Sequence, residues 1–207
     1  MSSKKNATPA PEPTQAASVI EIKPPNLQIR KFTIYGTAPL FQHKWSDKAK
    51  KQIIDNQTKK AKQPLAAKDP QADYEESMYK LPNGRYGFPA VAFKSAAVRA
   101  GKLLGLAMTD TRQMFFDMPD EGDLVVINGK PSPREDMVKT PGTVDVRYRA
   151  EFREWSAVLT VKFNADLMSE EQLVNLFEAA GFSVGVGEWR PEKNGMFGTF
   201  TLTKGAK

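Results

Sequence analysis

Glycines, aromatic residues and basic residues gather near the end of the chain, in GFSVGVGEWRPEKNGMFGTFTL from Gly181 to Leu202. Glycine-rich loops can cradle phosphates, but the P-loop pattern G-x-x-x-x-G-K-[ST] does not occur here. Arg190 also stands where the third glycine of a dinucleotide fingerprint starting at Gly185-x-Gly187 would be. Both fingerprints lie between a strand and the next helix, whereas this stretch follows an expected helix, so mononucleotide binding is not favoured.

Two interpretations of the stretch remain. In the first, Gly185 and Gly187 permit a strand bulge or the close approach of another backbone, and the chain turns after Pro191. In the second, Trp189 beside Arg190 offers a flat ring next to a cation, a pair that suits unstacked bases and the phosphates between them.

A basic strand, DVRYRAEFREW, is a second candidate for chemistry. Its arginines Arg147, Arg149 and Arg153 fall on one face of the strand, with aromatic residues near them. Such a face can track a phosphate backbone.

Lysines dominate residues 44–68, where eight lysines and two aspartates give a local charge of +6, equal to the charge of the whole chain. We expect Ser46 to cap a helix here, followed by a second helical piece around 70–80. The lysines are interpreted either as a solvated helix face or as contacts to a polyanion. The lysines assigned to phosphate contact are Lys44, Lys48, Lys50, Lys51, Lys59, Lys60 and Lys62.

The chain has few of the residue types that form common catalytic and metal sites. The chain has no cysteine and one histidine, His43, so thiolate sites and two-histidine zinc sites are excluded. We interpret His43 as an ordinary surface residue, with ligand contact as the alternative. Two acidic groups are weak metal candidates: Glu151, Glu154 and Glu188, and Asp117, Asp120, Glu121 and Asp123. We therefore predict no enzyme activity, no cofactor and no metal.

The elements that must position these residues follow from the hydrophobic pattern. Residues 1–26 are expected to be a disordered tail, in which VIEI at 19–22 could dock as an edge strand on this or a neighbouring copy. Residues 27–207 are expected to form one domain, with helices at 89–104 and 169–180, the second opened by a capping box and ended by Gly181. Lys94 and Arg99 lie off the apolar face of the first helix.

Short strands and turns are predicted around these helices. Turns are expected at Asn83-Gly84 and Asn128-Gly129, and strands at 182–186 and 196–202. The predicted fold class is α+β: a ferredoxin-like or RRM-like antiparallel sheet with two packed helices, a lysine-rich helical insertion at 44–80 and a β-rich excursion at 112–150. No apolar run approaches the length of a membrane helix and no signal peptide is evident, so a cytoplasmic protein is expected.

The order of elements and three stretches resemble the RAMP superfamily (repeat-associated mysterious proteins), the ferredoxin-like or RRM-like backbone subunits of CRISPR effector complexes. These stretches are TAPLFQHK, FPAVAFKSAAVRAG and GVGEWRPEKNGMFGTF. The resemblance implies that the glycine-rich loop and the first helix lie against a guide strand, whereas Glu188 and Glu192 depart from the basic loop of that superfamily. The residues carried over are Lys94, Gly185, Gly187, Trp189, Arg190 and Gly198. The chain also resembles a family of bacteriophage proteins that share the text YRAEF, EWSA, GVGEWRP and FG, which implies a phage origin and no particular activity.

The predicted function is non-catalytic binding of single-stranded DNA or RNA by a homo-oligomer that assembles along the strand, in phage replication, recombination or counter-defence. The alternative is a phage structural or protein-interaction component without nucleic-acid binding. A metal-dependent nuclease is a third hypothesis, which needs convergent carboxylates that the sequence does not identify. No motif discriminates RNA from DNA.

Overall fold

The computed structural model describes residues 22–45, 47–58, 69–140 and 143–203. In chain order the elements are β1 (Leu27–Gly36), β2 (Leu40–Gln42), α1 (Asp47–Gln57), α2 (Pro70–Glu76), β3 (Tyr79–Lys80), β4 (Tyr86–Pro89), α3 (Ala90–Leu103), α4 (Met108–Met114), β5 (Phe115–Met118), β6 (Leu124–Thr140), β7 (Thr143–Asn164), α5 (Glu170–Ser183), a 3-10 turn (Pro191–Lys193) and β8 (Phe200–Thr201).

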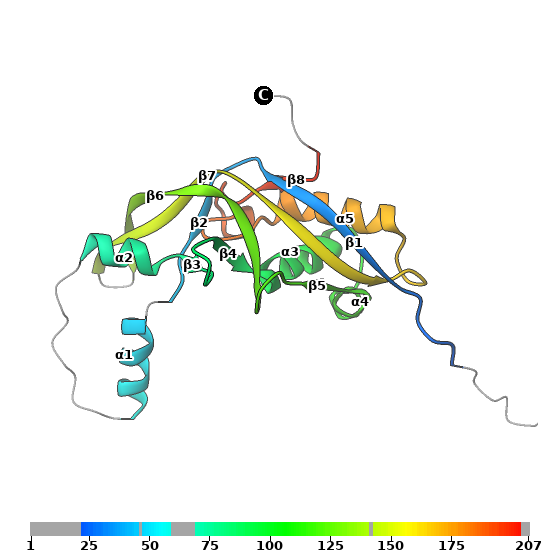
Figure 1. Cartoon of the computed structure of the whole chain (residues 1–207), viewed down its shortest axis with the longest axis horizontal. Coiled ribbons are helices and arrows are strands. Elements are labelled where there is room, and N and C mark those ends of the chain that lie inside the picture. The colour runs from blue at the N-terminus through cyan, green and yellow to red at the C-terminus, as the bar shows by residue number, and fades with distance from the viewer. Residues whose placement is uncertain (1–21, 46, 59–68, 141–142, 204–207) are drawn as a thin grey trace, which may run out of the picture.

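All strands join one antiparallel sheet with the order β3-β4-β6-β7-β1-β8, and β2 and β5 also pair with β7. β7 is 22 residues long and runs through the middle of this strongly curved sheet (Figure 1). The β6–β7 register shifts between Gly129 and Pro131, and this bulge lets both Phe152 and Trp155 point into the core.

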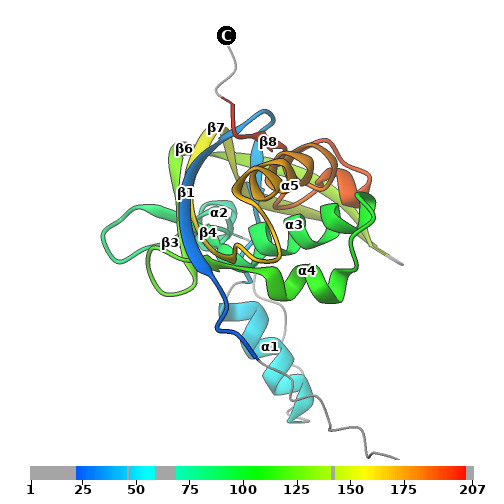
Figure 2. The same cartoon turned by 90° about the vertical axis from the view of Figure 1, so that its right-hand side faces the viewer.

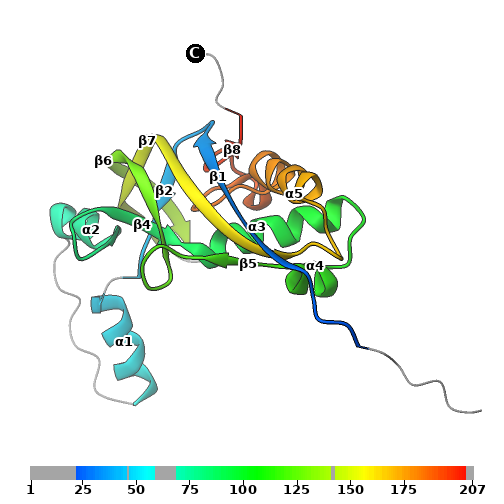
Figure 3. The same ribbon diagram turned by 45° about the vertical axis from the view of Figure 1, so that its right-hand side comes forward.

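Helices α3 and α5 lie together against one face of the sheet and enclose the core (Figure 2). Phe177 of α5 contacts Phe32 of β1 and Phe115 of β5 edge to face, at ring-centroid distances of 5.0 and 5.7 Å. Helix α1 projects from the body on the side of β3, apart from α3 and α5 (Figures 1 and 3). None of the helices in the described part of the chain is long and apolar enough to cross a membrane.

Several sequence expectations are confirmed. The α+β class with an antiparallel sheet is correct, and α3 and α5 match the two predicted core helices. The side chain of Ser169 accepts a hydrogen bond from Gln172 N and completes the predicted capping box. The turn at Asn83-Gly84 joins β3 to β4, with Gly84 at a φ of 77°. Two helices, α1 and α2, lie in the lysine-rich segment.

Other expectations are wrong. Asn128-Gly129 is no turn but lies inside β6, where a Cβ on Gly129 would approach Glu154 O to 2.6 Å. Residues 112–150 are β-rich as expected, but they are no excursion, because β6 and the first part of β7 form one long hairpin of the main sheet. The strand predicted at 182–186 is absent, since α5 runs on to Ser183, and the strand predicted at 196–202 shrinks to two residues. The predicted tail, apart from residues 22–26, lies outside the described residues.

Gly181 is inside α5 rather than after its end, and a Cβ there would lie 2.0 Å from the backbone oxygen of Phe200 in β8. We expect Gly181→Ala to lower the free energy of unfolding by about 1–3 kcal/mol, because the overpacking outweighs the better helix propensity of alanine. Urea denaturation measures this. The neighbouring substitution Phe182→Ala, at a side chain that is 83% exposed, is the control and should change little. Equal stability of Gly181→Ala and wild type would contradict the close-packing explanation.

Candidate functional site

The glycine-rich loop between α5 and β8 folds back over β2. Gly185, Gly187 and Gly198 have φ values of 69°, 81° and 66°, in the left-handed region. A Cβ on Gly187 would lie 2.6 Å from Phe41 O, and one on Gly198 would lie 1.7 Å from Val186 O. The backbone geometry of the loop therefore requires these glycines, as the first interpretation of the sequence expected.

Arg190 ties this loop to itself and to α3. Its Nη1 donates to Gly187 O at 3.0 Å, and its Nε donates to a carboxylate oxygen of Glu192 at 3.0 Å. Glu192 also forms an ion pair with Arg99 of α3. Burial lowers the pKa of Arg190. The two arginines are thus held near each other by one shared carboxylate.

Trp189 lies in the glycine-rich loop and has a φ of 51°. This left-handed conformation costs a non-glycine residue about 1 kcal/mol or more. Its ring contacts Phe41 and Phe197, at centroid distances of 6.2 and 6.3 Å. The guanidinium of Arg149 lies 5.2 Å from the ring centroid, a cation–π distance. The ring of Trp189 is therefore already engaged with protein groups.

The predicted arginine face of β7 is only partly open. Arg149 is 1% exposed because the loop with Trp189 covers this part of the sheet. The predicted contact of Arg149 with a nucleic-acid strand is therefore not available in this structure. Arg147 lies 3.6 Å from Asp145, and Arg153 lies 3.1 Å from Glu151. The side chain of Arg153 is 78% exposed.

A cluster of charges is buried beneath the loop. Arg134 Nε donates to Asp136 at 2.8 Å, and Arg134 also lies 3.4 Å from Glu151. Arg149 lies 3.6 Å from Asp136, but its Nε and Nη1 have no hydrogen-bond partner among the described residues. Burial lowers the pKa of Arg149, and nearby Glu188 and Asp136 partly offset this effect.

Because a buried ion pair with unmet donors stabilises little, we expect Arg149→Met to leave the free energy of unfolding unchanged or to raise it by about 1 kcal/mol. Asp136→Ala should lower it by about 3 kcal/mol, because that change leaves buried arginine charge uncompensated. Thermal or urea unfolding of the two variants measures the asymmetry. A large loss of stability in Arg149→Met would show instead that Arg149 is a net stabilising contact.

Lys94 and Asp117 meet where α3 crosses β5. The Lys94 ammonium lies 3.8 Å from the centroid of the Phe116 ring, and burial lowers its pKa. Burial raises the pKa of Asp117 to about 7, and the nearby Lys94 opposes this rise in part. The expected contact residue Lys94 is therefore partly engaged with the sheet edge.

The raised pKa of Asp117 has a consequence for stability. Between its ordinary pKa of 3.8 and about 7, the folded state holds a proton that the unfolded state has released. The free energy of unfolding contributed by this group therefore falls as the pH rises through that window. Asp117→Asn should stabilise the protein more at pH 8 than at pH 4, by a difference on the order of 3 kcal/mol. Denaturant titrations at both pH values test this, with the exposed Asp123→Asn as a control that should show no such difference. A pH-independent effect of Asp117→Asn would contradict it.

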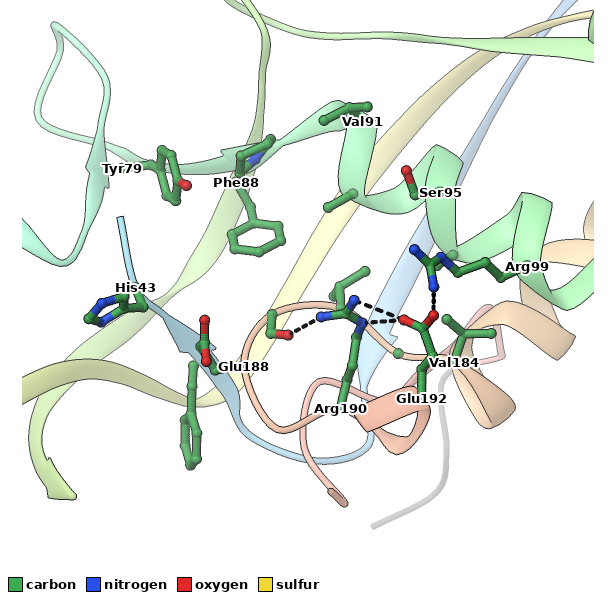
Figure 4. A pocket seen from close by; sticks show the side chains of 17 residues that line it. His43, Tyr79, Phe88, Val91, Ser95, Arg99, Val184, Glu188, Arg190 and Glu192 are labelled. Atoms are coloured by element: carbon green, nitrogen blue, oxygen red, sulfur yellow. Dashed lines mark hydrogen bonds and ion pairs between the residues drawn. The ribbon is translucent and has the colours of Figure 1, made fainter. Parts of the chain in front are cut away.

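A groove runs between the glycine-rich loop and the start of α3. Its central hollow has a volume of about 370 Å³ (Figure 4). His43, Tyr79 and Phe88 lie at one end of it, and Arg99 and Arg190 lie at the other. Burial lowers the pKa of His43. The hollow thus combines an aromatic end with a guanidinium end.

Two further hollows continue this groove. A hollow of about 390 Å³ shares His43 and Tyr79 with the central one and adds Lys44, Lys50 and Trp45. On the other side, a hollow of about 340 Å³ shares Arg99 and reaches the α3–α4 surface. We call the three together the α1–α4 groove. Its lining includes six cations and two carboxylates, namely Lys44, Lys50, Lys94, Arg99, Arg112, Arg190, Glu188 and Glu192.

The structure brings only some of the sequence candidates together. Those that line the groove are Lys44, Lys50, Lys94, Arg99, Gly185, Gly187 and Arg190. Lys51 is an exposed residue of α1, and Gly198 lies within the loop. Lys48 belongs to α1, but its side chain is outside the described part, as are Lys59, Lys60 and Lys62 altogether. Among the described residues, no group of three or more histidine, aspartate or glutamate side chains could hold a metal ion.

Sequence reasoning missed Trp45, Tyr79 and Arg112. Trp45 is 62% exposed and follows Lys44 directly. The same signal, an aromatic ring beside a cation, directed attention to Trp189 and applies equally to Trp45. Nothing local in the sequence marks Tyr79 or Arg112, which join the groove only through the fold.

Comparison with known proteins finds likenesses among solved structures. No protein-family model matches the chain, and no curated protein matches it. Among solved structures, the chain is similar to one in the cryo-EM structure of the Type III-B Cmr-beta bound to cognate target RNA, with a TM-score of 0.45 and 7% sequence identity. The similarity covers 86% of this chain and 60% of that chain, so this chain spans about three fifths of the other's length.

Proposed function

We propose that this protein binds single-stranded nucleic acid along the α1–α4 groove, without catalysis. The observation that carries the proposal is that three hollows with shared lining residues bring six cations onto one surface, with aromatic rings in two of the hollows. Proteins that bind single strands combine a positively charged groove with side chains on which bases stack. Both parts are present on one surface here.

Trp45 is the best placed stacking residue. Its side chain is largely exposed, and it shares a hollow with Lys44, Lys50 and two further rings, His43 and Tyr79. A base stacked on such a ring contributes about 1–3 kcal/mol, and neighbouring ammonium groups attract the phosphates on either side. Trp189, whose ring already contacts Arg149, is the weaker candidate.

The middle of the groove is less suited to phosphate. Glu192 neutralises Arg99 and Arg190 in part, and Glu188 adds a second carboxylate. The aromatic and apolar lining of this part, with Phe88 in its wall, suits a base rather than a phosphate. We therefore propose that phosphates lie mainly at the Lys44 end and at the Lys94–Arg112 end.

The proposal extends to the setting of this activity. From the resemblance to the RAMP superfamily and to the bacteriophage family, the proposal takes a RAMP-like, ferredoxin-type framework and a phage origin. It also includes side-by-side assembly of copies along a nucleic-acid strand. A protein-interaction component without nucleic-acid binding is the competing function.

Fluorescence polarisation with labelled single-stranded DNA and RNA, at roughly 50 and 200 mM salt, tests the proposal. We expect tighter binding at the lower salt, and Trp45→Ala should weaken binding by about 1–3 kcal/mol, or roughly 5- to 150-fold. Lys44→Ala should reduce the slope of log affinity against log salt by about 0.7.

Matched controls lie outside the groove. Phe182→Ala removes an aromatic ring that is 83% exposed, and Lys130→Ala removes an exposed lysine of β6. Neither should change affinity. Absence of binding at low salt, or equal losses in the groove variants and their controls, would refute the proposal. Cleavage of the oligonucleotide when Mg²⁺ is added would refute its non-catalytic part.

A further inference from the structure

Strand β1 has a long edge that no other strand of the described chain covers. β1 pairs with β7 from Leu27 to Tyr35, and β8 covers its other edge only at Tyr35 and Gly36. Ala165 N donates to Asn26 O at 2.8 Å, which sets the alternation of the ladder. The backbone N–H and C=O groups that point away from β7 therefore belong to Leu27, Ile29, Lys31 and Thr33.

This edge carries two charged residues, Arg30 and Lys31, but has neither of two other features that protect an edge strand, a proline or a bulge. The open edge of β6 beyond Ile127 contains Pro131 and Pro133, which remove hydrogen-bond donors and discourage pairing. Leu27 and Ile29 are about half exposed, at 51% and 49%. An added strand would thus find free backbone groups beside apolar side chains.

The chain before β1 is directed away from this edge. Pro24 and Pro25 favour an extended conformation, and Ile22 is 89% exposed. Figure 3 shows residues 22–26 leaving the end of β1 and running away from the sheet. At about 3.1 Å per residue, the linker of residues 23–26 places Ile22 roughly 15 Å from Leu27, at the start of β1. A tight reversal onto its own β1 edge is therefore disfavoured.

We propose that Val19–Ile22 of one copy adds as a strand to the free β1 edge of a second copy. The segment reads VIEI, with β-branched residues on both faces. Its backbone would pair with the free groups of Leu27, Ile29, Lys31 and Thr33, as peptides do when they extend a sheet. Glu21 would lie beside Lys31 on one face of the sheet, which pairs opposite charges, whereas Arg30 on the other face already forms an ion pair with Glu170.

The donor and the acceptor are different parts of the chain, so one copy can donate and accept at once. Such a contact links copies into a ring or a filament, unless two copies exchange their tails reciprocally. It would supply side-by-side assembly without using the α1–α4 groove, so it does not depend on the proposed nucleic-acid binding.

Analytical ultracentrifugation of the full chain without nucleic acid, over the micromolar range, tests the proposal. We expect wild type to self-associate with rising concentration and the tail variant Ile20→Asp/Ile22→Asp to remain monomeric. Lys31→Pro removes one outward N–H from the free edge and should also give a monomer. Lys31→Ala keeps that N–H and is its matched control, which should still self-associate, weakened at most about fivefold by the loss of the surface charge pair with Glu21.

A second measurement guards against misfolding of the proline variant. A labelled peptide of residues 15–26 should bind the tail variant, and it should bind at least about tenfold more weakly when Lys31→Pro is added. Circular dichroism establishes that both chains are folded. Association of the tail variant equal to that of wild type would overturn the proposal. A monomeric wild type would overturn the proposal as well. If the peptide then still binds the tail variant, the tail pairs with β1 of its own copy; if it does not bind, the edge accepts no strand.

Discussion

The backbone ladder of β7 is the interaction on which the other elements depend. β1, β2, β5 and β6 all hydrogen-bond to this one strand, β1 and β5 on opposite edges of its C-terminal half. A shift of β7 by one residue relative to these partners would turn its core side chains to the outer face of the sheet, because side chains alternate along a strand. The bulge between Phe152 and Trp155 marks the point where the two halves of the strand differ. The half toward Asn164 carries the core beneath α3 and α5, and the half toward Thr143 carries the charged cluster.

The glycine-rich loop makes contacts near both halves of β7. It packs on Phe41 of β2, covers Arg149 with Trp189, and reaches α3 through the ion pair of Glu192 with Arg99. The groove exists because this loop and the start of α3 face each other across His43 and Tyr79. The loop therefore shapes one wall of the groove with its backbone, while its charged residues Arg190 and Glu192 are engaged with each other and, through Glu192, with Arg99.

The sequence predicted the site unevenly, and the reasons are physical. Lys44 and Arg190 could be singled out because charge and loop composition are visible locally, whereas Lys94 was singled out through the family resemblance. Arg149 was placed on an open face because alternation along β7 says which residues share a face but not what covers it. Trp45 shows the same local signal as Trp189, and only the exposure of the two rings distinguishes them.

Local patterns by themselves determined the α+β class, the core helices α3 and α5 with the capping box at Ser169, and the concentration of lysines after β2. These features depend on neighbours a few residues apart. Tertiary structure alone decided that Gly181 lets β8 pack against α5 and that Arg149 is buried. It also decided that side chains from the segment after β2, from β3, from α3 and α4, and from the glycine-rich loop line one groove. Those outcomes depend on contacts between segments far apart in the chain, which no local pattern of charge or hydrophobicity encodes.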